Sequence, residues 1–353
     1  MTDCSLSFIY FCHMPFLKFS LGAILIFFIF SCNTNQAPNI SNIKVELQVQ
    51  RFEQDFFKID TNNVLQGVAS LKSKYPVFLD DFMSQILGFT NQTNPDTLSK
   101  YLRYFIRDYR FVKDTADNIF GDFEPQVNEI KRGLQYTKYY FPDYHPPGKI
   151  ITFIGPFDGF SDIITKDAFA VGLQLHIGQN FSFYKSDIAH DLFPEYIIQR
   201  FTPEYIPINA IKNVVDDIYP DKTIGRPLIE QMVEKGKRLY ILDKLLPGTK
   251  ESLKMGYTDK QMKDSYTNEA AVWDFFLNQD LLNTTDQDIT KNYIGESPKT
   301  QELGDEAPGN IGAFIGWQIT KKYMDKNPSV PLKKLLSTDN REIYNASKYK
   351  PVP

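Results

Sequence analysis

The sequence predicts an α+β fold that is predominantly helical, with a small central sheet and helices packed around it. Segments in which apolar residues recur with the period of a helix are many. Segments that alternate with the two-residue period of a strand are few, and they fall at 43–50 and within 149–177. A hydrophobic content of 42% is enough for a buried core, so we expect most of the chain to be folded. This mixture of elements is typical of the α+β class.

The charge balance and the length limit the classes of protein that fit. The chain has 353 residues, a net charge of −4 and a pI near 5.7. Nucleic-acid binders usually carry a basic excess, so we expect no nucleic-acid partner. The length suits one large domain or two modest ones. We predict a single globular domain over 43–353, in which a helical N-terminal part (43–148) precedes a C-terminal part (149–353) that combines sheet and helices.

The segment 1–31 has the pattern of a signal peptide. Residues 19–30 are an uncharged apolar run, too short to span a bilayer but of the length found in the core of a signal peptide. Lys18 supplies the positive charge ahead of this run if translation starts at Met14. Residues 1–13 contain neither Lys nor Arg, which favours Met14 as the start; an unusually long leading region is the alternative.

Cys32 is the predicted lipid-attachment residue. The apolar run ends in Phe-Ser-Cys at 30–32, which resembles a bacterial lipobox, where a small residue precedes the cysteine that is acylated. The alternative is an ordinary secretory signal in which Cys32 is incidental. Two or three acyl chains would hold the protein durably at a membrane, and residues 32–42 read as a lipidated cysteine followed by a polar tether. The other cysteines fall in the leader, which excludes disulfides and cysteine-ligated metal sites from the mature chain.

The N-terminal part is predicted to contain one strand followed by three helices. The alternation in 43–50 predicts a half-buried strand. A helix is expected over about 62–88. Asn94 followed by Pro95 predicts the start of the second helix, because Asn caps helices well and Pro is favoured in the first turn. The third helix is expected from about Pro125 to Tyr140.

The C-terminal part begins with the two-residue period and then becomes helical. KIITFI at 149–154 predicts a buried strand, and FAVGLQLHI at 169–177 predicts another. His176 would lie on the polar side of the second strand, where a solvated or hydrogen-bonded side chain is the ordinary interpretation. From His190 onward the pattern is helical, with interruptions at several prolines.

Caps and glycines mark the remaining helices. One helix is expected to end at Pro247-Gly248. Thr258 and Gln261 form a capping box that opens the helix carrying Trp273. Further helices are expected at 308–324 and 331–337. Gly312 and Gly316, four residues apart, share one face of the first of these, so a second helix can approach closely inside a soluble domain.

Few residues in the sequence have the type and spacing that a catalytic or metal site requires. A zinc peptidase helix carries His-Glu-x-x-His, but the segment that opens at His190 has Asp191 in the Glu position and Pro194 in the second His position. Glu234, in the position of a third ligand, is followed by Lys235 and Lys237 and is interpreted as a carboxylate on a solvated helix face. We therefore predict no catalytic residue, no metal and no cofactor, and His190 and Glu234 remain the only ligand candidates.

Several stretches together resemble one known family, the gliding motility-associated lipoproteins called GldB. They occur in a single order along nearly the whole mature chain: the lipobox around Cys32, AVGLQLHIG (170–178), FPEYIIQRFTPEYIP (193–207), MVEKGKRLYILDKLLPG (232–248), NEAAVWDFFLNQDLL (268–282), PGNIGAFIGWQITKKYM (308–324) and SKYKP (347–351). The resemblance implies a membrane-anchored lipoprotein of the cell envelope that bacteria need for gliding. The residues after Cys32, Asn-Thr-Asn-Gln, lack the acidic pair that often accompanies export to the cell surface, which favours an anchor facing the periplasm. Its implied partners are other proteins of the gliding and secretion machinery. It carries over one functional position, the lipid attachment at Cys32.

The order of strands and helices around 149–200 is also similar to that of predicted zinc proteases with a zincin-like fold. On this analogy the chain is a protease-derived scaffold whose metal site has been lost at Asp191 and Pro194. The favoured hypothesis is a non-enzymatic structural or assembly component of the motility machinery. The alternative is a divergent envelope metallopeptidase, or another periplasmic hydrolase, that uses His190 and Glu234. A carbohydrate-binding module, suggested by the aromatic content alone, is a third hypothesis.

Overall fold

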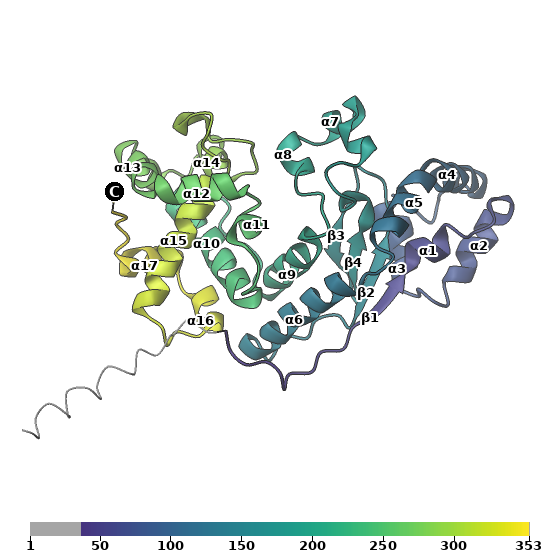
Figure 1. Cartoon of the computed structure of the whole chain (residues 1–353), viewed down its shortest axis with the longest axis horizontal. Helices are drawn as coiled ribbons and strands as arrows, with labels where there is room; N and C mark the ends of the chain where they lie inside the picture. The colour runs from purple at the N-terminus through teal and green to yellow at the C-terminus, as the bar shows by residue number, and fades with distance from the viewer. Residues whose placement is uncertain (1–36, 353) are drawn as a thin grey trace, which may run out of the picture. The chain divides into compact units, whose positions relative to one another are not determined.

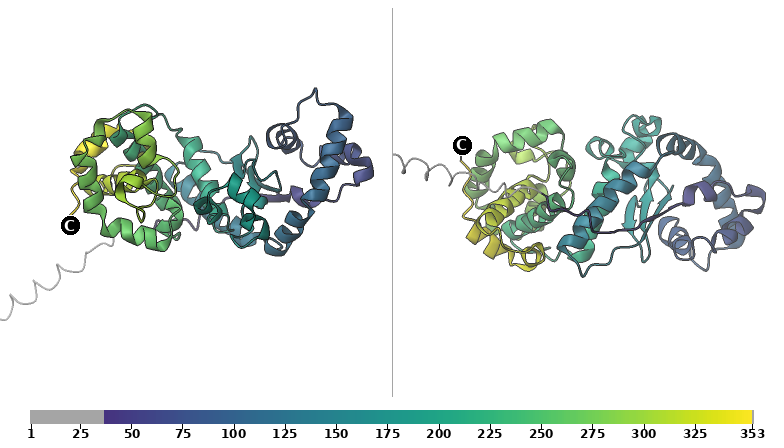
Figure 2. Two further views of the ribbon diagram at one scale, coloured as in Figure 1. Left: turned by 90° about the horizontal axis from the view of Figure 1, so that it is seen from above. Right: turned by 60° about the horizontal axis from the view of Figure 1, so that its bottom comes forward.

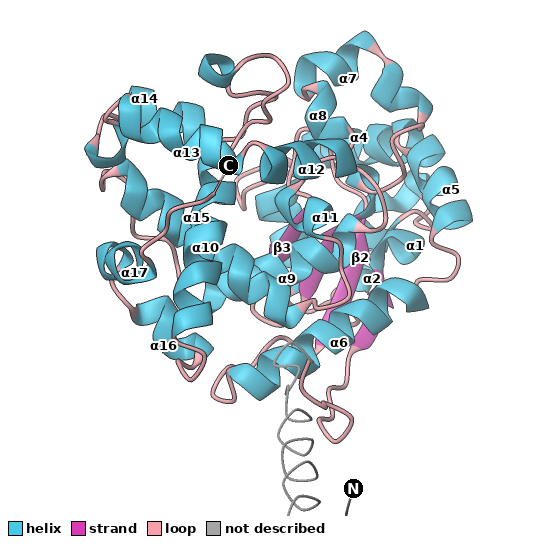
Figure 3. Ribbon diagram, turned by 60° about the vertical axis from the view of Figure 1, so that its left-hand side comes forward, coloured by secondary structure: helices cyan, strands magenta, loops and turns pink. Residues whose placement is uncertain are grey.

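A computed structural model describes residues 37–352 of the chain (Figure 1). The residues from Asn39 onward form one compact unit. Figure 3 shows a few strands surrounded by many helices, so the predicted class, α+β and predominantly helical, is confirmed. The predicted signal peptide (1–31) and Cys32 lie outside the described residues. No helix in the described part of the chain is both long and apolar enough to cross a membrane.

The sheet has four strands in the order β1-β2-β4-β3. β1 pairs with β2 and β2 with β4 in parallel, whereas β3 pairs with β4 in antiparallel fashion. The central strands are rich in Ile, Val and Phe and are almost completely buried, as expected for strands covered on both faces. The strands are β1 (Gln48–Arg51), β2 (Lys149–Phe153), β3 (Asp162–Ile164) and β4 (Phe169–Gly172).

The predicted first strand, 43–50, was too long at its start. β1 begins only at Gln48, whose N–H donates to the carbonyl oxygen of Gly148 at 3.0 Å. The partner strand β2 begins at Lys149, directly after Gly148. The two prolines before Gly148 have no N–H groups with which to extend the ladder. The alternating apolar residues upstream of β1 still pack against the core, but without a partner strand. The alternation at 43–50 therefore predicted the buried side chains correctly, but it did not predict where pairing with another strand begins.

The predicted strand 169–177 was also too long. β4 ends at Gly172, where the N–H of this glycine donates to the carbonyl oxygen of Ser161 just outside β3. The chain then turns into the 3₁₀ helix η3 (Leu173–Leu175). The side chain of Gln174 turns inward, and its Oε1 accepts the N–H of Gly155 at 3.0 Å. His176 consequently lies in the interior, not on a solvated strand face.

The N-terminal part contains the predicted helices, the first of them broken, and also two helices that were not predicted, α1 and α5. The predicted helix 62–88 is broken around Pro76, because Pro cannot donate to the preceding turn and disfavours helical geometry before it. The predicted cap at Asn94 is confirmed, since its Oδ1 accepts the N–H of Asp96 at 2.8 Å. The elements are α1 (Phe52–Phe56), η1 (Thr61–Asn63), α2 (Val64–Leu71), α3 (Phe78–Asp81), the π-helical turn η2 (Phe82–Ile86), α4 (Pro95–Asp108), α5 (Arg110–Ile119) and α6 (Glu124–Tyr140).

The helices of the C-terminal part include the predicted capping box. The Thr258 hydroxyl accepts the N–H of Gln261, whose side chain binds back to the N–H of Thr258. The helix that it opens, α12, ends at Thr267, so the prediction that it carries Trp273 was wrong: Trp273 lies on the next helix, α13. The elements are η4 (Ser182–Lys185), α7 (Asp187–Leu192), α8 (Glu195–Ile198), α9 (Tyr205–Ile218), α10 (Leu228–Leu245), α11 (Glu251–Met255), α12 (Asp259–Thr267), α13 (Glu269–Asn278), η5 (Leu281–Asn283), α14 (Gln287–Ile294), η6 (Gln301–Leu303), α15 (Ile311–Lys326), α16 (Leu332–Ser337) and α17 (Asn340–Ser347). The last of these was not predicted.

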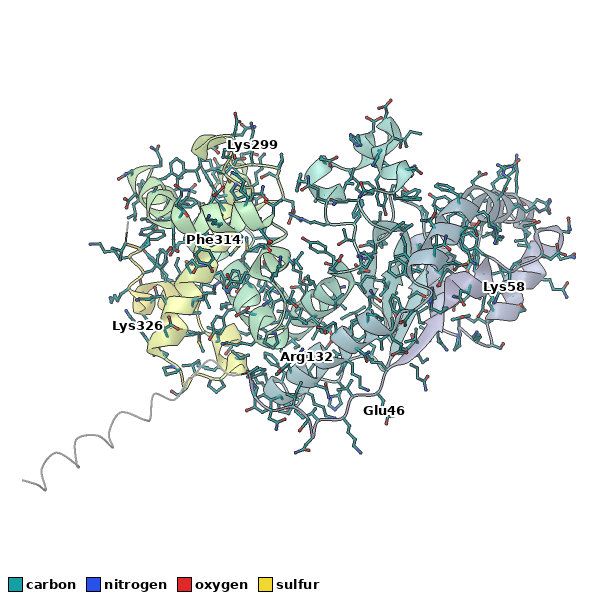
Figure 4. All side chains as sticks on the ribbon, viewed as in Figure 1. Glu46, Lys58, Arg132, Lys299, Phe314 and Lys326 are labelled. Carbon is teal, nitrogen blue, oxygen red and sulfur yellow. The ribbon has the colours of Figure 1, made fainter. Side chains whose placement is uncertain are left out.

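The closest helix contact is between α10 and α15. Gly236 on α10 faces Gly316 on α15, and a Cβ atom at either position would collide with backbone atoms of the other helix. Gly312, one turn before Gly316, faces Met232 and the carbonyl of Tyr293. The predicted close approach at the glycine face is therefore confirmed. Phe314, labelled in Figure 4, lies on the same helix and is completely buried.

The buried apolar side chains form one continuous cluster from Phe52 to Ile343. Figure 2 shows the first helices, coloured purple to blue, and the last helices, green to yellow, at opposite ends of this unit. Between them, α6 and α9 pack against each other and α9 packs against β3. Because α10 packs on α6 and α9 as well as on α15, it joins the sheet region to the C-terminal helices.

Candidate functional site

A polar cleft borders the start of α9. Its outer cavity has a volume of about 510 Å³ and is lined by the chain between α8 and α9, by α11 and the start of α12, and by the loop 295–310. Lys299, labelled in Figure 4, marks that loop. Tyr196, Tyr205 and Tyr257 are the aromatic residues in the lining, and Arg200 and Glu296 face each other across it. The volume is in the range of ligand-binding pockets.

Arg200 is the best-anchored charged side chain of the outer cavity. Its Nη1 donates to Glu296 Oε2 at 2.9 Å, and its Nε donates to the carbonyl oxygen of Gly256 at 3.2 Å. Its guanidinium lies 5.4 Å from the ring centre of Tyr196, within cation–π range. Gly256 has a positive φ of 74° at the end of α11, and a side chain there would collide with Arg200. The end of α11 thus fixes the position of the guanidinium.

An inner cavity of about 190 Å³ adjoins the outer one, since Glu296 and Asn310 line both. Its walls come from α9, α10, the end of α11 and the first turn of α15. The basic residues in its lining outnumber the acidic ones: Lys212, Lys235, Arg238 and Lys254 against Asp216 and Glu296.

Two of these four cations are paired within the protein. Arg238 binds Asp216 and also Glu234, the latter at 2.9 Å. Lys254, which is 1% exposed, binds Asp243. Lys212 and Lys235 have neither an ion pair nor a side-chain hydrogen bond within the described part of the chain.

Lys212 is the group whose ionisation the inner cavity changes most. Burial lowers the pKa of its ammonium group to about 8, and the positive charges of Arg200 and Lys235 act in the same direction. The carboxylates of Glu296 and Asp216 oppose this effect without cancelling it. Near neutral pH the cavity therefore holds a cation that is only just stable in its charged form.

The first turn of α15 closes the inner cavity. Asn310 has a positive φ of 58°, a conformation that Asn tolerates better than most residues. Its Oδ1 is buried without a hydrogen-bond partner in the described structure, and its side chain does not cap the helix. Since the first N–H groups of a helix lack partners within it, this end of α15 adds positive partial charge to the cavity.

We predict that Lys212→Met stabilises the protein at neutral pH. Below pH 8 the wild-type protein must bury the charged ammonium, whereas the unfolded chain keeps it in water; removing it should raise the free energy of unfolding by about 1–3 kcal/mol. The pKa of this lysine in the unfolded chain is 10.5. Between pH 8 and 10.5 the unfolded state therefore binds more protons than the folded state, so the stability of the wild type rises with pH and the advantage of the variant decreases. Urea unfolding of both proteins at pH 7 and pH 10.5 measures this. An advantage that is equal at both values would contradict it.

The ligand candidates from the sequence lie in different surroundings. His190 is on α7, about half exposed, with Nε2 3.7 Å from Glu195. Glu234 was predicted to lie on a solvated helix face. In the structure it is only 2% exposed and binds Lys237 and Arg238 at 2.9 Å each. The prediction was wrong because α17 was not foreseen: this helix covers α10, and Asn340 on it donates to Glu234 at 3.3 Å. Within residues 37–352 no three His, Cys, Asp or Glu side chains are arranged to hold a metal ion.

A buried cluster around His176 was also missed. His176 Nε2 lies 2.8 Å from Asp162 Oδ2, and Nδ1 lies 3.2 Å from the carbonyl oxygen of Thr202. Asn209 on α9 donates to the same Asp162 oxygen at 2.7 Å. The cluster ties β3, the chain after η3 and α9 together beneath the cleft. The predicted strand 169–177 placed His176 on a polar strand face and so could not reveal this cluster.

The cleft residues carried a faint signal in the sequence. Lys212 lies on α9 between the buried residues Ile211 and Val214, which places a charge near the core. Arg200 and Glu296 are far apart in the chain, and only the fold brings them together. No spacing rule links such residues.

The family model described as gliding motility protein GldB matches residues 33–351. The chain belongs to this family. The match spans the sheet, the cleft and the C-terminal helices alike, and it confirms the resemblance seen in the sequence. No curated protein and no solved structure matches the chain.

Membership in the GldB family identifies the chain as a gliding motility-associated lipoprotein. A lipoprotein of this kind is anchored to a membrane of the cell envelope. The family model begins directly after Cys32, the predicted lipid-attachment residue. Neither the family model nor the described residues include that cysteine.

Proposed function

We propose that this chain is a non-enzymatic assembly component of the gliding machinery, held to a membrane through a lipid on Cys32 and facing the periplasm. In this role it binds a segment of another envelope protein of the gliding and secretion machinery in the outer cavity. The family assignment supports the link to gliding, and the cavity supports the mode of binding.

The observation that carries the proposal is the preformed Arg200–Tyr196 arrangement at the mouth of the outer cavity. Arg and Tyr are the residue types that most often supply binding energy at protein interfaces. Glu296 and Gly256 already hold the guanidinium, so little side-chain entropy remains to be lost on binding. A second charged pair in the lining, Lys250–Asp259 at 2.7 Å, is well exposed and provides a polar rim.

Filling the cavity should stop gliding. Gln199 is an exposed lining residue at the end of α8 whose side chain makes no hydrogen bond in the described structure. Gln199→Trp adds bulk at the mouth of the cavity without removing a contact. We expect cells that carry this variant to lose surface movement while the amount of membrane-bound protein stays normal. Movement of single cells and immunoblots of the membrane fraction measure the two quantities.

Gln199→Ala is the matched control, because it changes the same position but leaves the cavity open. Cells with this variant should glide normally. A photo-crosslinking residue at position 199 should join the protein to another envelope protein in wild-type cells. Normal gliding of the Gln199→Trp cells at normal protein levels, with no crosslinked partner, would refute the assembly role through this cavity.

Removing the lipid-attachment residue should release the protein from membranes. In Cys32→Ala the thiol that would be acylated is absent, so the hydrophobic attachment of two or three acyl chains is lost. We expect the variant in the soluble periplasmic fraction and expect gliding to fail. A variant that stays in the membrane fraction, in cells that move normally, is incompatible with anchoring through Cys32.

A further inference from the structure

We propose that the inner cavity binds a compact oxyanion, a carboxylate or a phosphate, between Lys212, Lys235 and the first turn of α15. This goes beyond the proposed function, since it gives the chain a second ligand site of defined chemistry. The charged groups that line the cavity differ in whether another group of the protein neutralises them.

The acidic groups of the lining are already engaged elsewhere. Asp216 binds Arg238, and Glu296 binds Arg200 at 2.9 Å. The remaining cation, Lys254, is paired with Asp243. Lys212 and Lys235 are left over, and they come from two different helices, α9 and α10, that face the same space. The walls therefore present two positive charges without a counter-charge in the described part of the chain.

The start of α15 lies beside the same cavity. α15 begins at Ile311, and neither the N–H of Ile311 nor that of Gly312 has an acceptor in the structure between residues 37 and 352. The first of these two residues is 1% exposed and the second is buried, so bulk water has little access to them. Asn310, with its left-handed backbone, and Ala313 both line the inner cavity, which places this helix start at its wall. Unpaired N–H groups at a helix start favour anions.

The size of the cavity limits the ligand. About 190 Å³ is the space of roughly six water molecules in the liquid. This accommodates a carboxylate or a phosphate group and is smaller than the sites that hold whole cofactors or drug-sized molecules. An anion here would also complete the environment of Lys212, whose pKa is lowered in the empty cavity because burial and neighbouring cations oppose its charge.

The test measures the reactivity of Lys212 in the full mature lipoprotein, solubilised in detergent. The protein is treated briefly with acetic anhydride at pH 8 in chloride, phosphate or acetate buffers of equal ionic strength, and modified lysines are quantified by peptide mass spectrometry. A bound oxyanion stabilises the protonated, unreactive ammonium form of Lys212 and covers it, so we expect its modification to fall about threefold or more in phosphate or acetate relative to chloride. Greater protection by acetate indicates a carboxylate ligand, and greater protection by phosphate indicates a phosphate.

Lys263, exposed on α12 and without an ion pair in the described structure, is the internal control and should react equally in all three buffers. Thermal unfolding provides a second measurement. Phosphate or acetate should raise the Tm of the wild-type protein and leave that of Lys212→Gln unchanged. The Tm of Lys235→Gln should rise by less than that of the wild type. Equal modification of Lys212 in the three buffers, or protection of Lys263 to the same degree, would overturn the proposal. Failure here leaves the Gln199→Trp experiment unaffected, because that variant acts on the outer cavity.

Discussion

Gly316→Ala is expected to cost about 3 kcal/mol or more of folding free energy. The new Cβ would collide with the carbonyl of Met232 on α10, a backbone atom that cannot rotate away. The two helices would have to separate along a contact that also includes Gly236 and Gly312. Urea unfolding followed by circular dichroism measures the loss.

Gly148→Ala is the matched control for this effect. No atom lies within 4 Å of a Cβ built at this position, and its φ is not positive. The same chemical change should therefore be nearly neutral, or stabilise slightly by restricting the unfolded chain. Comparable losses at the two glycines would show that the contact between α10 and α15 is not what makes Gly316 necessary.

Asp162→Ala should have the second large effect, a loss of about 3–5 kcal/mol, because two buried partners of its carboxylate, on His176 and Asn209, would be left without it. Both ring nitrogens of His176 face oxygen atoms, and Nε2, which lies 2.8 Å from Asp162 Oδ2, would lose its partner. The side chains are 2% and 5% exposed, so water cannot replace the missing carboxylate. Asn209 would lose its acceptor as well.

Two comparisons separate this pair from a general effect of losing an aspartate. Asp162→Asn keeps an oxygen atom that can accept from the imidazole and should lose clearly less stability than Asp162→Ala. Asp143→Ala breaks the pair with Lys333, whose partners are 80% and 70% exposed, and should cost at most about 1 kcal/mol. If all three variants unfold at the same urea concentration, the pair between His176 and Asp162 contributes nothing specific.

The features that the sequence predicted well are those set within one or two helical turns. The cap at Asn94 and the capping box at Thr258 depend on hydrogen bonds between residues at most three apart. The glycine face of α15 follows from spacing along one helix, since Gly312 and Gly316 are one turn apart. The predominantly helical α+β class follows from periodicity over many such segments.

The errors occur where a residue's environment comes from a distant part of the chain. The alternation at 43–50 reflects the burial of one side of an extended segment. The hydrogen-bond ladder covers only the end of this segment, because two prolines precede the partner strand β2, about a hundred residues later in the chain. The carboxylate of Glu234 was expected in water because its neighbours in sequence are lysines. In the fold it is covered by α17, and those neighbours become its buried partners or line a cavity.

The sequence by itself determined the family, the fold class and the positions of the main helix caps, because each can be read from patterns within short stretches of the chain; it also predicts the lipid attachment at Cys32. Only the tertiary structure decided the cleft. Arg200 meets Glu296, and Lys212 meets Lys235 and the start of α15, through the packing of α9, α10 and α15. Charges separated by many residues interact once burial removes water from between them, and no local pattern encodes which of them will be left without a partner.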